Sequence, residues 1–199
     1  MPSFNKSPEN FQSPLMLNDF LKFWKKSKNP FAGLNQIKNS DTSIRSLLSK
    51  KVTSKFIAFA EHDTESLVAF WLHDGTTSPE NAPIVWLDSE GSPNGVFANT
   101  TQDFLTILPY GTGLIYEFLY CWEDYIRDPQ ETPHPKEELD AERINSFLEE
   151  TKEEFSGWKN LVDWLDSVNI DWKSVNPFQI MEKAFTAHPN LDEWLEKNV

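Results

Sequence analysis

The stretch of residues 83–111, PIVWLDSEGSPNGVFANTTQDFLTILPYG, constrains the fold more than any other part of the chain. Residues 84–87 form a β-rich apolar run, residues 88–94 supply acidic and turn-forming side chains, and residues 95–98 form a second short apolar run. Gly, Pro and Asn are residue types that reverse a chain between two strands. The stretch therefore predicts two short strands joined by an acidic turn.

A short helix is expected directly after these strands. Asn99 or Thr100 can cap its first turn, because the side-chain oxygen of either residue can accept from a free backbone N–H. Its apolar face consists of Phe104, Leu105 and Leu108. Pro109 and Gly111 are expected to end the helix.

A β-hairpin is expected upstream. Residues 56–60 and 66–72 are dense apolar runs, and the polar segment 61–65 separates them. Strands are therefore expected at residues 56–61, 66–73, 83–88 and 95–98. Strands without polar alternation are typical of sheets that are covered on both faces. We predict an α+β fold with a mainly antiparallel sheet of four to six strands flanked by helices and a helical C-terminal extension.

The order of elements across residues 56–122 resembles the SUKH superfamily, which includes bacterial toxin-immunity proteins and a fungal cell-wall regulator. The shared order is strand, polar turn, strand, linker, strand, and a helix carrying Phe104-Leu105. The turn at residues 62–65 lacks the glycine that family members tend to have, the first fifty residues match loosely, and the last sixty do not match. The resemblance implies an immunity protein that neutralises a toxin, often a nuclease, and it supplies no residue motif that maps a binding site.

Three parts are expected along the chain. Residues 1–14 are polar and contain proline, which predicts a mobile tail; residues 15–130 are expected to form the SUKH-like α+β domain, and residues 131–199 a helical extension packed on it. Helices are expected at residues 17–25 and 44–50, and a core helix is expected from Gly113 to the break at Asp128-Pro129. The broad apolar stripe of the core helix consists of Leu114, Ile115, Phe118, Leu119, Trp122 and Ile126.

Composition restricts the class of protein. The 199 residues suit one domain, and no run of eighteen apolar residues is present, so no membrane partner is expected. The first residues lack the apolar core of a secretory signal. The single cysteine, Cys121, lies in an apolar helical stretch, where we expect a small buried side chain in a reducing, cytoplasmic environment.

Charge is distributed unevenly along the chain, whose net charge is −13. Residues 1–60 contain ten Lys and Arg against three Asp and Glu, whereas residues 61–116 contain eight Asp and Glu and no Lys or Arg. An acidic surface repels the phosphates of nucleic acids and attracts basic proteins. A basic protein partner is therefore expected, and a nucleic-acid partner is not. The alternative is that the acidity only maintains solubility.

Catalytic and metal-binding patterns are weak. His62 and His73 would fall at opposite ends of the hairpin ladder, about 20 Å apart at about 3.3 Å per residue, so no metal site is expected. His134 and His188, each beside proline, are expected at the surface. Asp88 and Glu90 share a turn, where acids are more often turn formers than a catalytic pair. No nucleophile elbow, phosphate-binding loop or dinucleotide fingerprint is present, so neither catalysis nor a cofactor is expected.

Binding to a protein is the remaining hypothesis, and eight residues are its candidates. Six are acids expected in turns and two are tryptophans that could anchor an interface: Asp63, Glu65, Trp71, Asp74, Glu80, Trp86, Asp88 and Glu90. The competing interpretation places both tryptophans in the core and the acids on solvated loops. Two other functions stay open, a regulatory scaffold that acts through the helical extension and a hydrolase with paired carboxylates.

Overall fold

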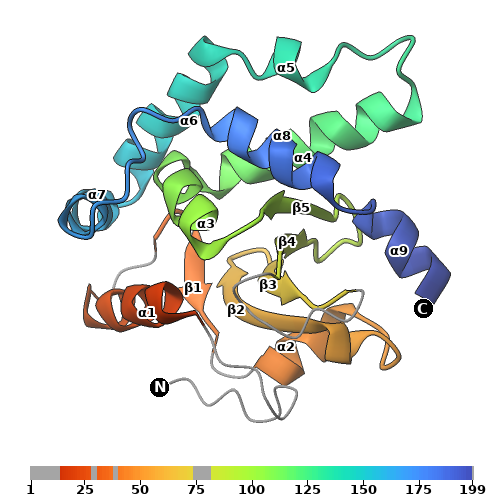
Figure 1. The fold of residues 1–199 in the computed structure, drawn as a ribbon, viewed down its shortest axis with the longest axis horizontal. Helices are drawn as coiled ribbons and strands as arrows, with labels where there is room; N and C mark the ends of the chain where they lie inside the picture. The colour runs from red at the N-terminus through yellow and green to blue at the C-terminus, as the bar shows by residue number, and fades with distance from the viewer. Residues whose placement is uncertain (1–13, 28–30, 38–39, 74–81, 199) are drawn as a thin grey trace.

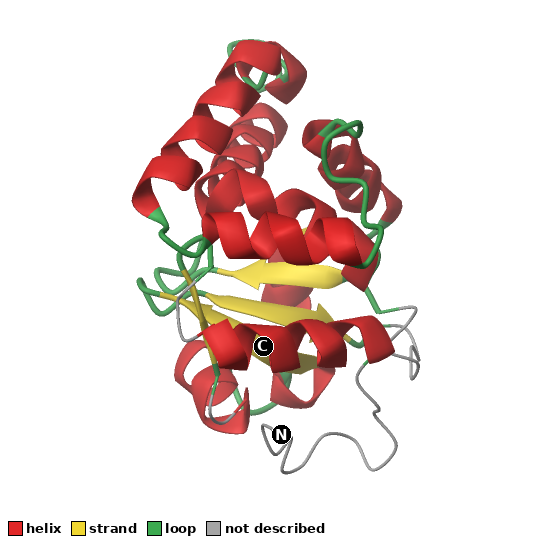
Figure 2. Ribbon diagram, turned by 90° about the vertical axis from the view of Figure 1, so that its left-hand side faces the viewer, coloured by secondary structure: helices red, strands yellow, loops and turns green. Residues whose placement is uncertain are grey.

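The structure, a computed structural model, is an α+β fold built on one five-stranded antiparallel sheet. It describes residues 14–27, 31–37, 40–73 and 82–198. Helices lie on both sides of the sheet, as the edge-on view in Figure 2 shows. The predicted fold class is confirmed. Within the described residues, no helix has the length and apolar character needed to cross a bilayer.

The strands follow one another across the sheet in sequence order (Figure 1). They are β1 (Leu34–Gln36), β2 (Phe56–His62), β3 (Leu67–Trp71), β4 (Ile84–Leu87) and β5 (Gly95–Ala98). The last four lie where the sequence predicts them. The hairpin of β2 and β3 has the expected ends, because the His62 N–H donates to Ser66 O and the Leu72 N–H donates to Lys55 O, each at 2.7 Å. The short edge strand β1 was not predicted.

Both faces of the sheet are buried, as the dense apolar runs indicate. Val68 and Phe70 of β3 point into a large first core, whereas Ala69 and Trp71 point into a smaller second core on the opposite face. The first core is closed by α1 (Leu15–Ser27), α3 (Thr101–Ile107), α4 (Gly111–Arg127), α6 (Ala141–Glu154), α7 (Trp158–Ser167) and α8 (Pro177–Ala187). The second core is closed mainly by α2 (Ser40–Leu47) and α9 (Leu191–Asn198).

Local sequence signals explain where α3 and α4 begin and end. Thr100 is the cap of α3: its Oγ1 accepts from the Asp103 N–H at 3.0 Å, and the Asp103 carboxylate accepts from the Thr100 N–H at 3.1 Å. A 3₁₀ turn at Leu108–Tyr110 then leads into α4, which ends just before Asp128 as expected. One residue of the predicted apolar stripe is misplaced, because Ile126 at the end of α4 is 48% exposed.

The helices after residue 131 contribute to both cores. The short helix α5 (Pro135–Glu138) contacts α4, α8 packs against β5, and the α9 residues Leu191 and Leu195 are buried in the second core. Helices that follow residue 131 therefore bury much of the apolar surface of the sheet. The predicted tail at residues 1–14 lies outside the described residues except for Pro14, which is buried.

Candidate functional site

The acidic loop 88–94, between β4 and β5, is held in shape by its own polar side chains. The Asp88 N–H donates to Asn94 Oδ1 at 2.8 Å, and Asn94 Nδ2 donates to Gly91 O at 2.6 Å. Asp88 Oδ1 accepts from the Glu90 N–H at 2.9 Å. The peptide bond between Ser92 and Pro93 is cis. Because these bonds close the loop on itself, its acidic side chains are presented in a fixed arrangement.

Asp88 also joins the loop to the neighbouring hairpin. Its Oδ2 accepts from Ser66 Oγ at 3.2 Å and from Trp86 Nε1 at 3.3 Å. Ser66 is completely buried, and its Oγ in turn accepts from the Ser89 N–H at 3.1 Å. The carboxylate of Asp88 is therefore committed to positioning the loop, while Glu90 at the tip is exposed.

A hollow of about 400 Å³ lies on one side of the loop, and we call it the hairpin hollow. It is lined by the β2–β3 turn, the loop and the start of α4, with the residues His62, Thr64, Trp86, Asp88, Ser89, Glu90, Thr112, Gly113 and Tyr116. Two predicted acids, Asp88 and Glu90, thus lie in one concave site. Burial raises the pKa of Tyr116, and the nearby charges of Asp88 and Glu90 raise it further.

The polar groups of the hairpin hollow do not form a catalytic triad. His62 Nδ1 accepts from the Thr64 N–H at 3.2 Å and lies 2.9 Å from Thr64 Oγ1. Burial lowers the pKa of His62 and outweighs the opposing charges of Asp63 and Asp88, so the imidazole is neutral at pH 7. A triad requires a group that orients the base, and the Asp88 carboxylate, which also lines the hollow, is directed to Ser66 and Trp86 instead.

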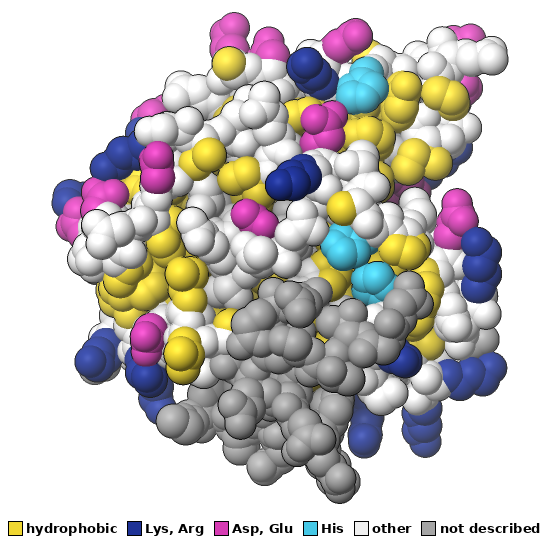
Figure 3. Space-filling view, in the orientation of Figure 1, with side chains coloured by type: hydrophobic (Ala, Val, Ile, Leu, Met, Phe, Trp, Pro, Cys, Tyr) yellow, Lys and Arg dark blue, Asp and Glu magenta, His cyan; other side chains and the backbone are white. Residues whose placement is uncertain are grey.

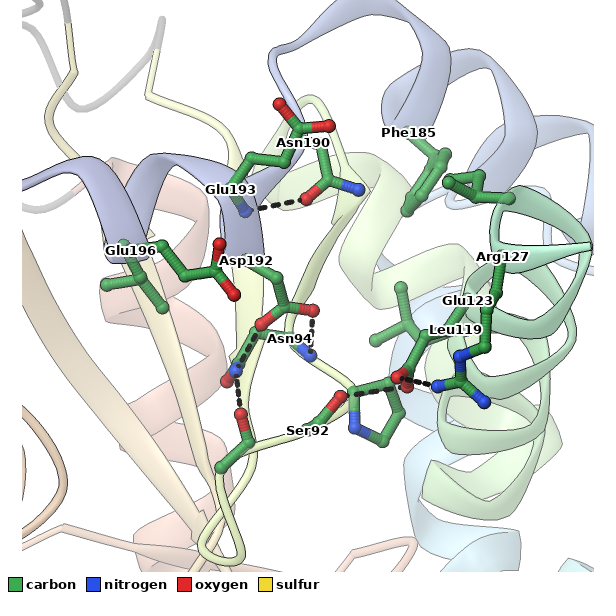
Figure 4. A pocket seen from close by; sticks show the side chains of 14 residues that line it. Ser92, Asn94, Leu119, Glu123, Arg127, Phe185, Asn190, Asp192, Glu193 and Glu196 are labelled. Carbon is green, nitrogen blue, oxygen red and sulfur yellow. Dashed lines mark hydrogen bonds and ion pairs between the residues drawn. The ribbon is translucent and has the colours of Figure 1, made fainter.

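A larger hollow of about 650 Å³ lies on the other side of the loop, between α4 and α9, and we call it the α4–α9 hollow (Figure 4). Its lining residues are Gly91, Ser92, Pro93, Asn94, Leu119, Glu123, Ile126, Arg127, Phe185, Asn190, Asp192, Glu193, Leu195 and Glu196. Asp192 of α9 accepts from the Asn94 N–H at 3.2 Å and from Asn94 Nδ2 at 2.6 Å. Glu123 of α4 accepts from Ser92 Oγ at 2.8 Å. The two carboxylates thus attach the loop to both helices.

The α4–α9 hollow is acidic. Burial raises the pKa of Asp192 although Asn94 hydrogen-bonds to it, and the charges of Glu123 and Glu196 contribute in the same direction. Arg127 is the one cationic residue among the described residues that line the hollow, and its guanidinium is already bound to Glu123 at 2.5 Å and to Asp124 at 3.1 Å. The negative potential of the carboxylates that line the hollow favours a cationic ligand.

The structure distributes the eight predicted partner-binding residues unevenly. Asp88 and Glu90 line the hairpin hollow, and Asp63 and Glu65 are exposed in the β2–β3 turn, where Asp63 accepts from Asn35 Nδ2 at 2.6 Å. Asp74 and Glu80 lie outside the described residues. The structure adds acids that the sequence analysis did not select, and these are Glu123, Asp192, Glu193 and Glu196.

The two tryptophans are not surface anchors, which corrects the prediction made for them. Trp71 is 0% exposed in the second core, where it stacks on Phe56 and meets Trp194 edge to face. Trp86 is 2% exposed, in the first core on the opposite face of the sheet. Both are buried because helices cover both faces, so neither is an exposed anchor, although Trp86 contributes to the lining of the hairpin hollow.

The remaining sulfur and imidazole groups have structural environments. Cys121 is buried, its thiol donates to Glu138 Oε2 at 3.2 Å, and burial together with Glu138 raises its pKa to about 12. His134 and His188, expected at the surface, are both half-buried. His134 packs against Trp122, while His188 lies 3.2 Å from His73 and 2.8 Å from Asn99. No group of three or more metal-ligating side chains occurs within the described ranges.

The free energy of unfolding should depend on pH because of the half-buried histidines His62 and His188. Burial lowers the pKa of His62 and of His188, and His73 lowers that of His188 further. The unfolded chain, with histidine pKa values near 6.5, then binds protons that the folded protein does not, so the free energy of unfolding should decrease as pH falls through about 6.5. Chemical denaturation between pH 7.5 and pH 5.5 measures this decrease. A His62→Gln/His188→Gln variant should show a flatter profile, and identical profiles would contradict the assignment.

Comparison with known proteins gives no relative from which a role could be transferred. The chain matches no family model, no curated protein and no solved structure.

Proposed function

We propose that this protein acts by binding a basic protein partner and not by catalysis, through an acidic face formed by loop 88–94 and the two hollows beside it. The observation that carries the proposal is the lining of the hollows by six carboxylates, against one cationic residue among the described lining residues. These carboxylates belong to Asp88, Glu90, Glu123, Asp192, Glu193 and Glu196. Complementary charge accelerates the encounter of two proteins and favours basic partners.

The distribution of charge over the whole chain supports the same proposal. Figure 3 shows one side of the molecule, on which Asp and Glu side chains lie mainly in the upper half, whereas Lys and Arg side chains lie along the lower rim as well as higher up. The sequence has no Lys or Arg between residues 61 and 116, the span that includes the acidic loop. An approaching basic protein would be oriented by this separation of charge.

An immunity role is the specific form of this function that the resemblance to SUKH proteins favours. Nuclease toxins bind phosphates and therefore carry basic active-site clefts. An acidic inhibitor that occupies such a cleft excludes the substrate by charge and by volume. Co-expression with the product of the neighbouring reading frame tests this form: growth should be restored by the wild-type chain, and a toxic product that the chain neither binds nor neutralises would contradict it.

The charge mechanism is tested with two matched triple variants. Glu90→Gln/Glu193→Gln/Glu196→Gln removes three carboxylates from the hollows, and Glu150→Gln/Glu153→Gln/Glu154→Gln removes three exposed carboxylates from α6. Affinity for a basic partner captured at low salt should fall about tenfold in the first variant, at roughly 0.5 kcal/mol for each rim charge, and little in the second. Affinity of the wild type should also fall as salt rises. Equal losses in both variants, or affinity independent of salt, would refute a localised acidic site.

Deletion of residues 135–199 would not test the scaffold hypothesis. Such a deletion removes α8, which packs against β5, and α9, whose Leu191 and Leu195 fill the second core. The remaining chain would expose both cores and lose its fold, so loss of binding would not identify a scaffold. Exposed substitutions such as the α6 variant test that hypothesis without removing the core.

A further inference from the structure

Two tyrosines form an exposed aromatic pair on α4 beside the hairpin hollow. Tyr116 is 41% exposed and Tyr120 is 48% exposed, whereas the α4 residues Ile115, Phe118 and Leu119 are buried. The two rings are one helical turn apart, with centroids separated by 6.4 Å and planes inclined by 17°. Two nearly parallel aromatic faces are thus available at the surface.

Carboxylates surround this pair. The charges of Asp88 and Glu90 act on Tyr116 from the loop, and Asp124 raises the pKa of Tyr120 through its charge and a hydrogen bond. Glu123 acts on both rings, and its two oxygens are bound to Arg127 and to Ser92, while Asp124 is bound to Arg127 as well. The exposed Glu90 is therefore the carboxylate of this group best placed to accept from a ligand. We call the two tyrosines with Asp88, Glu90, Glu123 and Asp124 the tyrosine patch.

We propose that the tyrosine patch binds arginine side chains of the basic partner, an inference that rests on the proposed function and adds a preference for arginine over lysine. A guanidinium is planar, so it can stack on an aromatic face while its N–H groups donate to a carboxylate in two parallel hydrogen bonds. A lysine ammonium is a compact, strongly hydrated charge and makes only one of these interactions well. Both cations lie over rings elsewhere in the described residues: Arg143 is 4.4 Å from the centroid of Phe147, and Lys152 and Lys173 are 5.3 Å and 5.2 Å from the centroids of Trp158 and Trp172. The preference for arginine therefore depends on the bidentate hydrogen bonds and not on the ring contact alone.

Charge complementarity selects this occupant over the other candidates. A second copy of the chain that paired through the same face would bring carboxylates against carboxylates, and a nucleic acid would bring phosphates. An apolar partner would leave the acids around the rings without water or counter-charge. An arginine side chain of the partner can stack on the aromatic rings and also pair with a carboxylate.

The test uses two blocked peptides of equal length, one with glycine alternating with arginine and one with glycine alternating with lysine. Isothermal titration at physiological ionic strength should give an affinity of the wild type for the arginine peptide about fivefold higher than for the lysine peptide. In Tyr116→Ala/Tyr120→Ala this ratio should fall to about one through loss of arginine affinity, with lysine affinity unchanged. Tyr116→Phe/Tyr120→Phe retains both rings and should retain the ratio.

The outcomes separate this inference from the proposed function. If both peptides bind equally well and salt weakens both, the acidic face is supported and the arginine preference is refuted. If the wild type binds the arginine peptide more tightly and the alanine variant keeps the same affinity ratio, the arginine preference arises elsewhere on the protein and the proposal for the tyrosine patch is refuted. If neither peptide binds even at low salt, both the inference and the proposed function fail. Backbone amide shifts confined to α4 and loop 88–94 on titration would support the location.

Discussion

Replacing Trp71 with alanine should lower the free energy of unfolding by about 4 kcal/mol. The side chain is completely buried in the second core between Phe56 and the α9 residue Trp194, so its loss leaves a cavity that α9 cannot readily fill. Because natural domains are stable by about 5–15 kcal/mol, this change removes a large part of the total. Urea denaturation followed by circular dichroism measures the loss.

The matched comparison for Trp71 is the exposed aromatic pair. Tyr116→Ala/Tyr120→Ala should change the free energy of unfolding by less than about 1 kcal/mol, because both residues lie at the surface and neither belongs to the core. A second comparison uses the indole nitrogens: Trp86 Nε1 donates to Asp88, whereas Trp71 Nε1 has no hydrogen-bond partner among the described residues. Trp71→Phe should therefore cost less than Trp86→Phe. A Trp71→Ala variant that keeps its stability but loses partner binding would restore the interface role rejected above.

Replacing Gly111 with alanine should lower the free energy of unfolding by about 3 kcal/mol, combining backbone strain with overpacking. Gly111 has φ 82° and ψ 165°, a conformation that residues with a Cβ rarely adopt. It is buried at the start of α4, and an added Cβ would overlap Oγ1 of the buried residue Thr151 on α6. Thermal and chemical denaturation measure the change.

Two variants separate the two causes at Gly111. Gly91→Ala places a Cβ at φ 101° with no atom within 4 Å, so its cost reports backbone strain without a clash. Thr151→Ala removes the Oγ1 that the added Cβ would overlap. In this background, Gly111→Ala should lower the free energy of unfolding by about as much as Gly91→Ala does in the wild type. A cost for Gly111→Ala no larger than for Gly91→Ala would contradict the close packing of α4 on α6.

The central part of the fold could be predicted because its signals are local. Four strands, the capped helix α3 and the end of α4 each follow from neighbouring residues, and their positions are confirmed. The strand β1 was missed because its three residues, Leu34–Gln36, are too few to give an alternating pattern, and pairing with β2 is what makes them a strand. Ile126 was wrongly assigned to the core. Periodicity predicts which face of a helix a residue lies on, but it does not predict over what length of the helix other elements pack against that face.

Only one part of the acidic face could be predicted, namely loop 88–94, because its residues are contiguous in the sequence. Asp88 and Glu90 belong to a turn that the sequence reveals, whereas the contact of Asn94 with Asp192 joins residues 98 positions apart. No pattern within either segment predicts this contact, so the sequence did not identify Glu123, Asp192, Glu193 and Glu196 as site residues. The tryptophans were proposed as anchors because a single sequence does not tell whether an aromatic side chain on a strand meets a helix or a partner.

The attachment of loop 88–94 to α9 has a consequence for biosynthesis. The ribosome must deliver about a hundred further residues after the loop before Asp192 can accept from Asn94 and the wall of the α4–α9 hollow can close. The proposed binding of a basic partner would therefore become possible only late in translation, and a nascent chain that stalls before α9 would display its acidic loop without the α9 wall of the hollow.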